Sequence, residues 1–163
     1  MLAATASLQS RSWGATLAPM DKVIVVTGAS RGIGAATARL AGERGYTVCV
    51  NYRQNRAAAD EVVRAIQSGG ARAAAVQCDV SAEADVVRLF EEADRLGAVT
   101  ALVNNAGILE TQMRLDAMDA ARLHRVLAVN VVGTFLCARE AVRRMSTRHG
   151  GRGGAIVNVS SDA

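Results

Sequence analysis

From residue 23 onwards, the chain alternates short apolar runs with longer stretches in which apolar residues recur every three or four positions. The short runs match buried strands, and the longer stretches match amphipathic helices. Strands that alternate with helices predict repeated βαβ units and a parallel sheet, so we expect a doubly wound α/β fold. The predicted strands are Val23–Val26, Thr47–Asn51, Ala73–Gln77, Ala101–Asn104 and Ala155–Val159.

Two helices carry more specific signals. Ser81 is the predicted N-cap of the helix before the fourth strand, with Glu83 and Asp85 in its first turn. The longest helical stretch runs from about residue 117 to 148, and Asn130 and Gly133 lie near its middle. These two residues predict a bend or a functional interruption at that point.

The chain has 163 residues, which suits one domain, and we assign residues 20–163 to it. Residues 1–19 are rich in Ala, Ser and Thr, and their single charge is Arg11. They are predicted to be a disordered or leader-like extension. Two interpretations remain open: a targeting leader, or an extension upstream of a true start at Met20.

The composition excludes several classes of partner. The net charge is +4, but the arginines stand beside Asp and Glu on helical faces, which is typical of solvated helix surface. Aromatic residues make up 3% of the chain, too few for a base-stacking platform, so we expect no nucleic-acid binding. No apolar stretch reaches spanning length, so we expect no membrane partner.

Cysteine and histidine usage favours a reduced, metal-free protein. Cys49, Cys78 and Cys137 are far apart, odd in number and inside apolar runs, which predicts buried reduced thiols and a cytoplasmic chain. His124 and His149 have no second ligand at metal spacing, so no metal site is expected.

A glycine loop, residues 27–34, follows the first strand and opens into an alanine-rich helical stretch. Gly28 permits a sharp turn after the strand, Gly32 lacks the Cβ that would block a diphosphate, and Gly34 allows close helix packing. The helix that begins near Ile33 then offers free N–H groups and a positive dipole end to an anion. This order of strand, glycine turn and helix predicts a dinucleotide-binding loop.

The segment Asn104-Asn105-Ala106-Gly107 follows the fourth strand. With the strand order 3-2-1-4-5, the first and fourth strands are neighbours, so this segment and the glycine loop share one crevice. Asx side chains there can hold neighbouring backbone, and Gly107 leaves room for a flat ligand. Asp79 faces the same crevice or supplies N-terminal charge to the following helix, and both interpretations stay open.

The motifs of the chain resemble, in the same order, those of the short-chain dehydrogenase/reductase family, a family with an NAD(P)-binding Rossmann fold. The similarity runs from about Lys22 to the last residue and is nearest to 3-oxoacyl-carrier-protein reductases and glucose 1-dehydrogenase-like members. The motifs that carry it are Thr27-Gly28-x-x-x-Gly32-x-Gly34, Cys78-Asp79-Val80, Asn104-Asn105-Ala106-Gly107, Asn130 ahead of Gly133, and Ile156-Val157-Asn158-Val159-Ser160-Ser161.

The resemblance implies hydride transfer between nicotinamide and the carbon of a small alcohol or ketone substrate. It implies that Asn130 holds a water in a proton relay and that Ser161 orients and polarises the substrate oxygen. The family also uses Tyr-x-x-x-Lys, with the Tyr as general acid/base. The motif does not occur in residues 1–163, where Lys22 is the single lysine, so we expect a dinucleotide-binding half with an inactive site.

The end of the second strand predicts the cofactor. Tyr52 stands where NAD-using relatives carry an acidic residue, and Arg53, Arg31 and Ser30 can bind a ribose 2′-phosphate, so we expect NADP, with NAD less favoured. The predicted cofactor-binding residues are Thr27, Gly28, Ser30, Arg31, Gly32, Ile33, Gly34, Arg53, Asp79, Val80, Asn104, Ala106 and Gly107.

Two further functions stay open beside an oxidoreductase represented by an incomplete chain. One is a non-catalytic NADP(H)-binding module, and the other is an inert gene fragment. The resemblance also implies a possible homo-oligomer, because family members associate through the long helix that here covers residues 134–148.

Overall fold

The computed structural model of the chain describes residues 22–161, so the predicted extension at residues 1–19 lies outside the described residues. The strands are β1 Lys22–Val26, β2 Thr47–Tyr52, β3 Ala73–Gln77, β4 Ala98–Asn104 and β5 Ala155–Asn158. The α-helices are α1 Gly32–Glu43, α2 Arg56–Ser68, α3 Glu83–Leu96, α4 Ala120–Leu127 and α5 Gly133–Met145. Shorter helical turns are η1 Leu115–Ala117, η2 Ala128–Val132 and η3 Thr147–His149.

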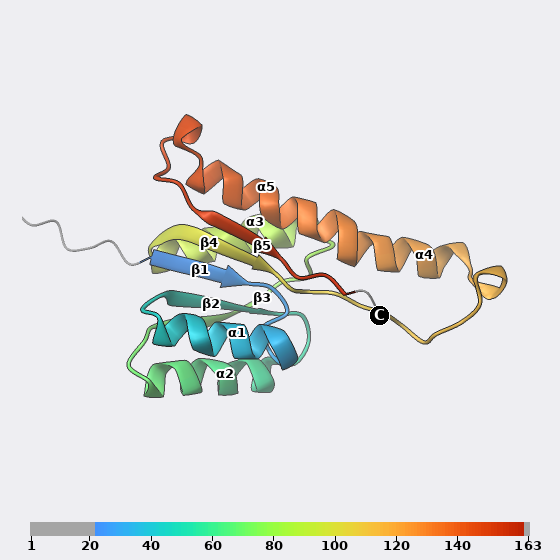
Figure 1. Cartoon of the computed structure of the whole chain (residues 1–163), viewed down its shortest axis with the longest axis horizontal. Helices are drawn as coiled ribbons and strands as arrows, with labels where there is room; N and C mark the ends of the chain where they lie inside the picture. The colour runs from blue at the N-terminus through green and yellow to red at the C-terminus, as the bar shows by residue number, and fades with distance from the viewer. Residues whose placement is uncertain (1–21, 162–163) are drawn as a thin grey trace, which may run out of the picture.

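The strands form one parallel sheet with the order β3-β2-β1-β4-β5, which confirms the predicted doubly wound fold. In the register, Val26 of β1 pairs with Val50 of β2 and with Val103 of β4. The carboxyl ends of these three strands therefore meet at one edge of the sheet (Figure 1).

Helices cover both faces of the sheet, and alternate residues of β1 serve the two cores. Ile24 and Val26 belong to the core packed against α1 and α2, whereas Val23 and Val25 belong to the core packed against α3 and α5. Figure 1 shows α1 and α2 on one side of the strands and α3 and α5 on the other. This two-sided burial explains why the strands are continuously apolar.

The three cysteines lie in buried positions, as predicted, and all three are free thiols. Burial raises the pKa of Cys49, Cys78 and Cys137 to about 12, so these thiols stay protonated at neutral pH. No group of three potential metal-ligating side chains occurs among residues 22–161. In the same part of the chain, no helix combines the length and apolar character needed to cross a bilayer.

The predicted N-cap of α3 is wrong by one residue. The cap position is Ala82, whose side chain makes no cap hydrogen bond, and the hydroxyl of Ser81 instead donates to Asp79 Oδ1 at 2.7 Å. Asp79 competes successfully because its carboxylate also accepts the Ser81 N–H, so that both Ser81 donors are used in the turn before the helix. Glu83 and Asp85 do lie in the first turn of α3.

The predicted interruption of the long helical stretch is confirmed. The π-helical turn η2 separates α4 from α5, and Asn130 lies within it. The Thr134 hydroxyl donates to the Asn130 carbonyl oxygen at 3.0 Å. Gly133 begins α5 against Val80, where an added Cβ would lie 2.9 Å from Val80 Cγ2. The interruption thus lies next to a tight contact between α5 and the segment after β3.

Six large apolar side chains are exposed along α4, η2 and α5, namely Leu123, Leu127, Val131 and Phe135, together with Val132 and Val142. Figure 1 shows these elements as one nearly continuous rod. The spacing of the first four residues is one every four positions, so they share one side of the rod. The homo-oligomer expected through this helix stays a prediction.

An arginine cluster fixes α5 on α3. Glu140 is 3% exposed and contacts Arg143 Nη1 at 2.7 Å and Arg144 Nη1 at 2.9 Å. Arg144 also pairs with Asp94 of α3 at 2.8 Å and lies over the Phe90 ring. Burial raises the pKa of the Glu140 carboxyl, but the hydrogen bond and charges of the arginines outweigh burial and hold the pKa below its ordinary value. Glu140 therefore organises the side chains that join the two helices.

Replacing Glu140 with Gln leaves these arginines without their buried counter-charge, and we expect a loss of about 3 kcal/mol in unfolding free energy. Because the folded-state pKa is lowered, the stabilisation is present above the ordinary glutamate pKa and disappears as pH falls through the folded-state value. Urea unfolding from pH 7 to pH 3 should show the two chains converging at the acid end. The exposed Glu91→Gln variant is the control, and an equally large effect there would contradict the assignment.

Candidate functional site

Thr27 joins the end of β1 to the end of β4. Its buried hydroxyl donates to the Val103 carbonyl oxygen at 3.3 Å and accepts the backbone N–H groups of Asn105 at 2.9 Å and Ala106 at 3.0 Å. One donor and two lone pairs are all that a hydroxyl offers, so its hydrogen-bonding capacity is filled. The glycine loop and the segment after β4 are thereby fixed side by side.

The Asn105 side chain makes the second connection. Its amide nitrogen donates to the carbonyl oxygens of Thr27 at 2.9 Å and Gly28 at 3.2 Å, which confirms that an Asx side chain here holds neighbouring backbone. Gly34 leaves the space for this contact. A Cβ on Gly34 would lie 2.6 Å from the Gly28 carbonyl oxygen and still closer to the Asn105 side-chain nitrogen. The predicted close packing at Gly34 is therefore confirmed.

Gly28 turns sharply away from β1 with a φ of +61°, and an added Cβ would lie 2.9 Å from Ala106 Cα. Its N–H donates to Asn51 Oδ1 at 3.0 Å. The other end of the Asn51 amide donates to the carbonyl oxygens of Val76 and Cys78. Asn51 was missed as a site residue, although a buried amide at the end of an apolar strand is the kind of signal that could have found it.

The outer part of the glycine loop is open. Gly32 has a φ of +55°, and no atom lies within 4 Å of where its Cβ would be. Arg31 and Ile33 are exposed and Ser30 is half-buried. Arg31 occupies the N-cap position of α1 without a side-chain cap hydrogen bond. The first amides of α1 therefore point to a surface with room for an anion, as a diphosphate needs.

Arg53 and Asp79 form an ion pair after β2 and β3, with Arg53 Nε 2.9 Å from Asp79 Oδ2. Burial raises the pKa of Asp79, but the hydrogen bonds from Ser81 and the charge of Arg53 outweigh it and lower the pKa below the ordinary value. Asp79 thus both shapes the turn before α3 and holds the side chain predicted to meet a 2′-phosphate. Val80 is buried against Gly133 at the start of α5.

Asn104 and Asn130 brace the other side of the site. The Asn104 side-chain nitrogen donates to Asn158 Oδ1 at 3.0 Å and to the Thr134 carbonyl oxygen. The Asn130 side chain accepts the Ile108 N–H at 2.9 Å and donates to the Ile108 carbonyl oxygen at 2.8 Å. Its Oδ1 would lie 3.5 Å from a Cβ on Gly107, and this ordinary contact distance leaves Gly107 unstrained.

Ser161 is exposed at the last described position, after β5. The Val159 N–H donates to the Asn104 carbonyl oxygen at 2.9 Å, so the segment that leads to Ser161 continues along the carboxyl end of β4. Ser161 therefore follows the carboxyl end of β5, and the glycine loop follows the carboxyl end of β1 in the same sheet.

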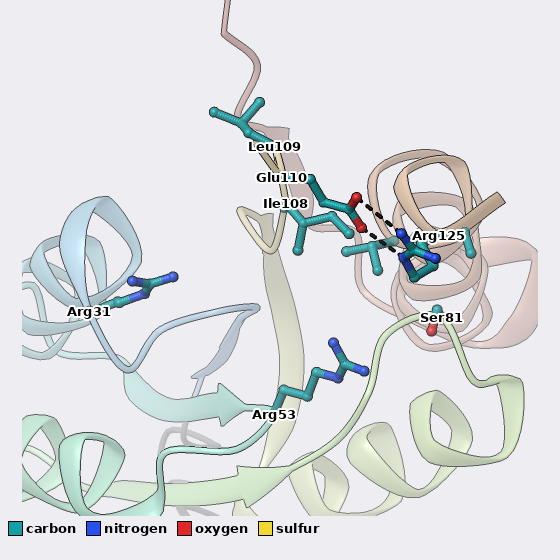
Figure 2. Close-up of a pocket in the computed structure, with 10 residues that line it drawn as sticks. Arg31, Arg53, Ser81, Ile108, Leu109, Glu110 and Arg125 are labelled. Atoms are coloured by element: carbon teal, nitrogen blue, oxygen red, sulfur yellow. Dashed lines mark hydrogen bonds and ion pairs between the residues drawn. The ribbon is translucent and has the colours of Figure 1, made fainter. Parts of the chain in front are cut away.

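A cavity of about 640 Å³ lies at this edge. Figure 2 shows Arg31 and Arg53 extending toward it from the elements of the glycine loop and β2, while Ile108 and Glu110 come from the segment after β4. Its apolar lining comes from Ile108, Leu109, Ala128 and Val129, and its remaining lining residues are Arg31, Arg53, Ser81, Gly107, Glu110 and Arg125. The cavity thus combines a cationic side with an apolar side.

Of the predicted cofactor-binding residues, Arg31, Arg53 and Gly107 line this cavity. Glu110 and Arg125 were missed, because a carboxylate and a guanidinium 15 residues apart on a loop and a helix carry no sequence signal of their pairing. Ser81 was assigned to the helix cap alone. These residues surround a space suited to a ligand with an anionic group and a flat apolar group.

Comparison with known proteins agrees with this architecture. The family model described as short chain dehydrogenase matches residues 22–163. An uncharacterized oxidoreductase of Escherichia coli, YgfF, is 54% identical over 142 residues, which cover 86% of this chain and 58% of that protein. The cis-4-hydroxycyclohexanecarboxylate dehydrogenase of Sinomonas cyclohexanicum is 44% identical, over 86% of this chain and 55% of the relative.

The solved structures lead to the same family. A putative short-chain alcohol dehydrogenase from Sinorhizobium meliloti 1021 superposes with a TM-score of 0.79 at 35% identity, over 86% of this chain and 54% of that one. The chain spans about half the length of the curated relatives it matches. The matched family model, the sequence identities and the shared fold establish that this chain belongs to the short-chain dehydrogenase/reductase family.

Proposed function

We propose that this chain is the NADP(H)-binding part of an oxidoreductase that acts on an alcohol or ketone. The observation that carries the proposal is the cavity that Arg31 of the glycine loop lines together with Arg53 and Gly107 (Figure 2). Backbone N–H groups at the start of α1 suit the diphosphate, and the two guanidinium groups suit an additional phosphate.

The preference for NADP over NAD rests on charge at the end of β2. Tyr52 is 2% exposed, and no carboxylate follows it directly to receive a ribose 2′-hydroxyl. Arg53 Nε lies 2.9 Å from Asp79 Oδ2, and the Arg53 side chain is 58% exposed, so its guanidinium stays accessible to a phosphate. Among residues 22–161, the Arg31 guanidinium has no ion-pair partner, so it adds uncompensated positive charge.

When bound, the nicotinamide supplies or accepts a hydride, and this chain's own residues bind and orient. Asn130 fixes the segment after β4 through both backbone groups of Ile108. By family resemblance, Ser161 orients the substrate oxygen, and Asn130 takes part in a proton relay. Residues 1–163 contain no Tyr-x-x-x-Lys, and Tyr46 and Tyr52 lie beside or within β2. We therefore expect residues 1–163 to bind NADPH with negligible turnover.

The expected substrate class is taken from a relative of similar sequence. The relative from Sinomonas cyclohexanicum is a hydroxycyclohexanecarboxylate dehydrogenase, which supports a secondary alcohol and its ketone as the substrate class. A non-catalytic NADP(H)-binding module is the second candidate, because the glycine loop and the cavity account for nucleotide binding alone. NADPH binding is expected of both candidates. Turnover by a longer natural form of the protein, tested with cyclic secondary alcohols and NADP, distinguishes them.

The two arginines provide the first test. Arg31→Gln and Arg53→Gln should each weaken NADPH binding about tenfold, because each removes a charge-assisted contact to the 2′-phosphate, while NADH binding stays nearly constant. Equilibrium titration of both nucleotides measures the ratio. Arg56→Gln is the matched control, since Arg56 is exposed, pairs with Asp60 and does not line the cavity. Wild-type protein that binds NADH more tightly than NADPH would contradict the cofactor assignment.

The glycine loop provides the second test. Gly32→Ala places a methyl group in the open space proposed for the diphosphate, and its φ of +55° adds roughly 1–2 kcal/mol of backbone strain. Gly45→Ala is the control, because Gly45 has a φ of +82° and equally open surroundings but follows the opposite end of α1.

Both glycine variants should lose similar unfolding free energy, and Gly32→Ala alone should lose binding of NADPH and NADH together. Thermal unfolding and nucleotide titration of the two proteins measure these effects. Equal nucleotide affinity in the two variants would place the diphosphate elsewhere.

A further inference from the structure

Glu110 is the one non-glycine residue among residues 22–161 with a positive φ, at +54°. Side chains other than glycine, asparagine and aspartate rarely adopt this left-handed conformation, which costs free energy. Glu110 lies on the segment after β4 and lines the cavity described above. An unfavourable backbone conformation at a cavity edge raises the question of which contact maintains it.

The contact is a two-pronged ion pair with α4. Arg125 Nε donates to Glu110 Oε1 at 2.8 Å, and Arg125 Nη2 donates to Glu110 Oε2 at 3.2 Å. Figure 2 shows the two side chains facing one another across the edge of the cavity. Arg122, whose side chain is 10% exposed, adds a contact to Glu110 Oε2 at 3.6 Å. The parallel geometry restricts both side chains more than a single contact does.

Three consecutive residues are held in this way. The Asn130 side chain binds both backbone groups of Ile108, Arg122 Nη2 donates to the Leu109 carbonyl oxygen at 3.4 Å, and Arg125 binds the side chain of Glu110. Each of these side chains comes from α4 or η2. Residues 108–110 are therefore bound along their length to α4 and η2. Their C-terminal end is held by the ion pair of Glu110 with Arg125.

We propose that Glu110 and Arg125 are positioning residues for the nucleotide site: their ion pair holds Ile108 and Leu109 in place as the apolar side of the cavity, against which the adenine ring packs. This inference rests on the proposed function. The apolar lining formed with Ala128 and Val129 suits a flat ring, and it adjoins the cationic side that suits the 2′-phosphate. The pair acts through the segment and does not itself touch the phosphate.

The opposite charge changes of two variants distinguish a positioning role of the ion pair from a direct electrostatic effect on the nucleotide. Glu110→Met adds one unit of net positive charge near the cavity, and Arg125→Met removes one. If the pair acted only through its field on an anionic nucleotide, the two variants would change affinity in opposite directions. If the pair positions the segment, both variants weaken binding, and the double variant is no weaker than either single variant.

The experiment measures NADPH and NADH affinity by titration for the wild type, Glu110→Met, Arg125→Met, the double variant and the exchanged pair Glu110→Arg with Arg125→Glu. We expect each single variant to weaken both nucleotides about fivefold, the size of one well-formed exposed ion pair, with an unchanged NADPH to NADH ratio. The exchanged pair should recover at least half of the lost affinity. Thermal unfolding should show every variant folded at the temperature of the titration.

Hydrogen exchange supplies a readout that needs no nucleotide. The Ile108 amide, which donates to Asn130 Oδ1, should exchange faster in both single variants and return toward wild-type protection in the exchanged pair. Opposite effects of the two single variants on affinity, additive effects in the double variant, or unchanged affinity would overturn the proposal. Wild-type protein that binds neither nucleotide refutes the proposed function itself, whereas normal wild-type binding that no variant alters refutes only the positioning role.

Discussion

The Thr27 hydroxyl is the interaction on which the site depends. With one donated and two accepted hydrogen bonds, it fixes the ends of β1 and β4 to each other in a buried position. Loss of the hydroxyl would leave two partly buried N–H groups without a partner, which costs more than the bonds contribute when formed. Asn105 reinforces the same junction from the side chain, and Gly34 leaves the room it needs. Arg31 and Gly107, which follow the two joined strands, consequently reach one cavity.

Some arginines form ion pairs that join helices and loops, and others leave positive charge at the cavity. Arg144 pairs with Asp94 to fasten α5 to α3, Arg139 pairs with Glu83 across the same two helices, and Arg125 pairs with Glu110. These contacts neutralise part of the positive charge locally. The positive charge that remains at the cavity comes from Arg31 and from the partly shared Arg53. A small concentration of charge beside a glycine loop favours a compact anion over a polymer.

The sequence was sufficient for the strands, their order and the roles of Gly34 and Asn105, because each depends on local periodicity or on the fixed geometry of a strand-turn-helix unit. It was insufficient for contacts between distant segments. Asn51 binds the backbone of both the glycine loop and the end of β3, and the pairing of Glu110 with Arg125 depends on how the loop after β4 folds back on α4. The Ser81 cap failed for a related reason: the Ser81 hydroxyl donates to the nearby Asp79 carboxylate and does not accept an N–H of the helix.

The helical rod of α4, η2 and α5 links the stability of the fold to the shape of the cavity. Val80 lies against Gly133, and this contact fixes the distance between the start of α5 and the segment after β3. The π-helical turn immediately before Gly133 carries Asn130, so its position relative to the sheet is set by the same contact. Asn130 can then meet both backbone groups of Ile108 with hydrogen bonds of normal length. A glycine packed in the core thus determines where the apolar side of the cavity stands, although it lies outside the cavity lining.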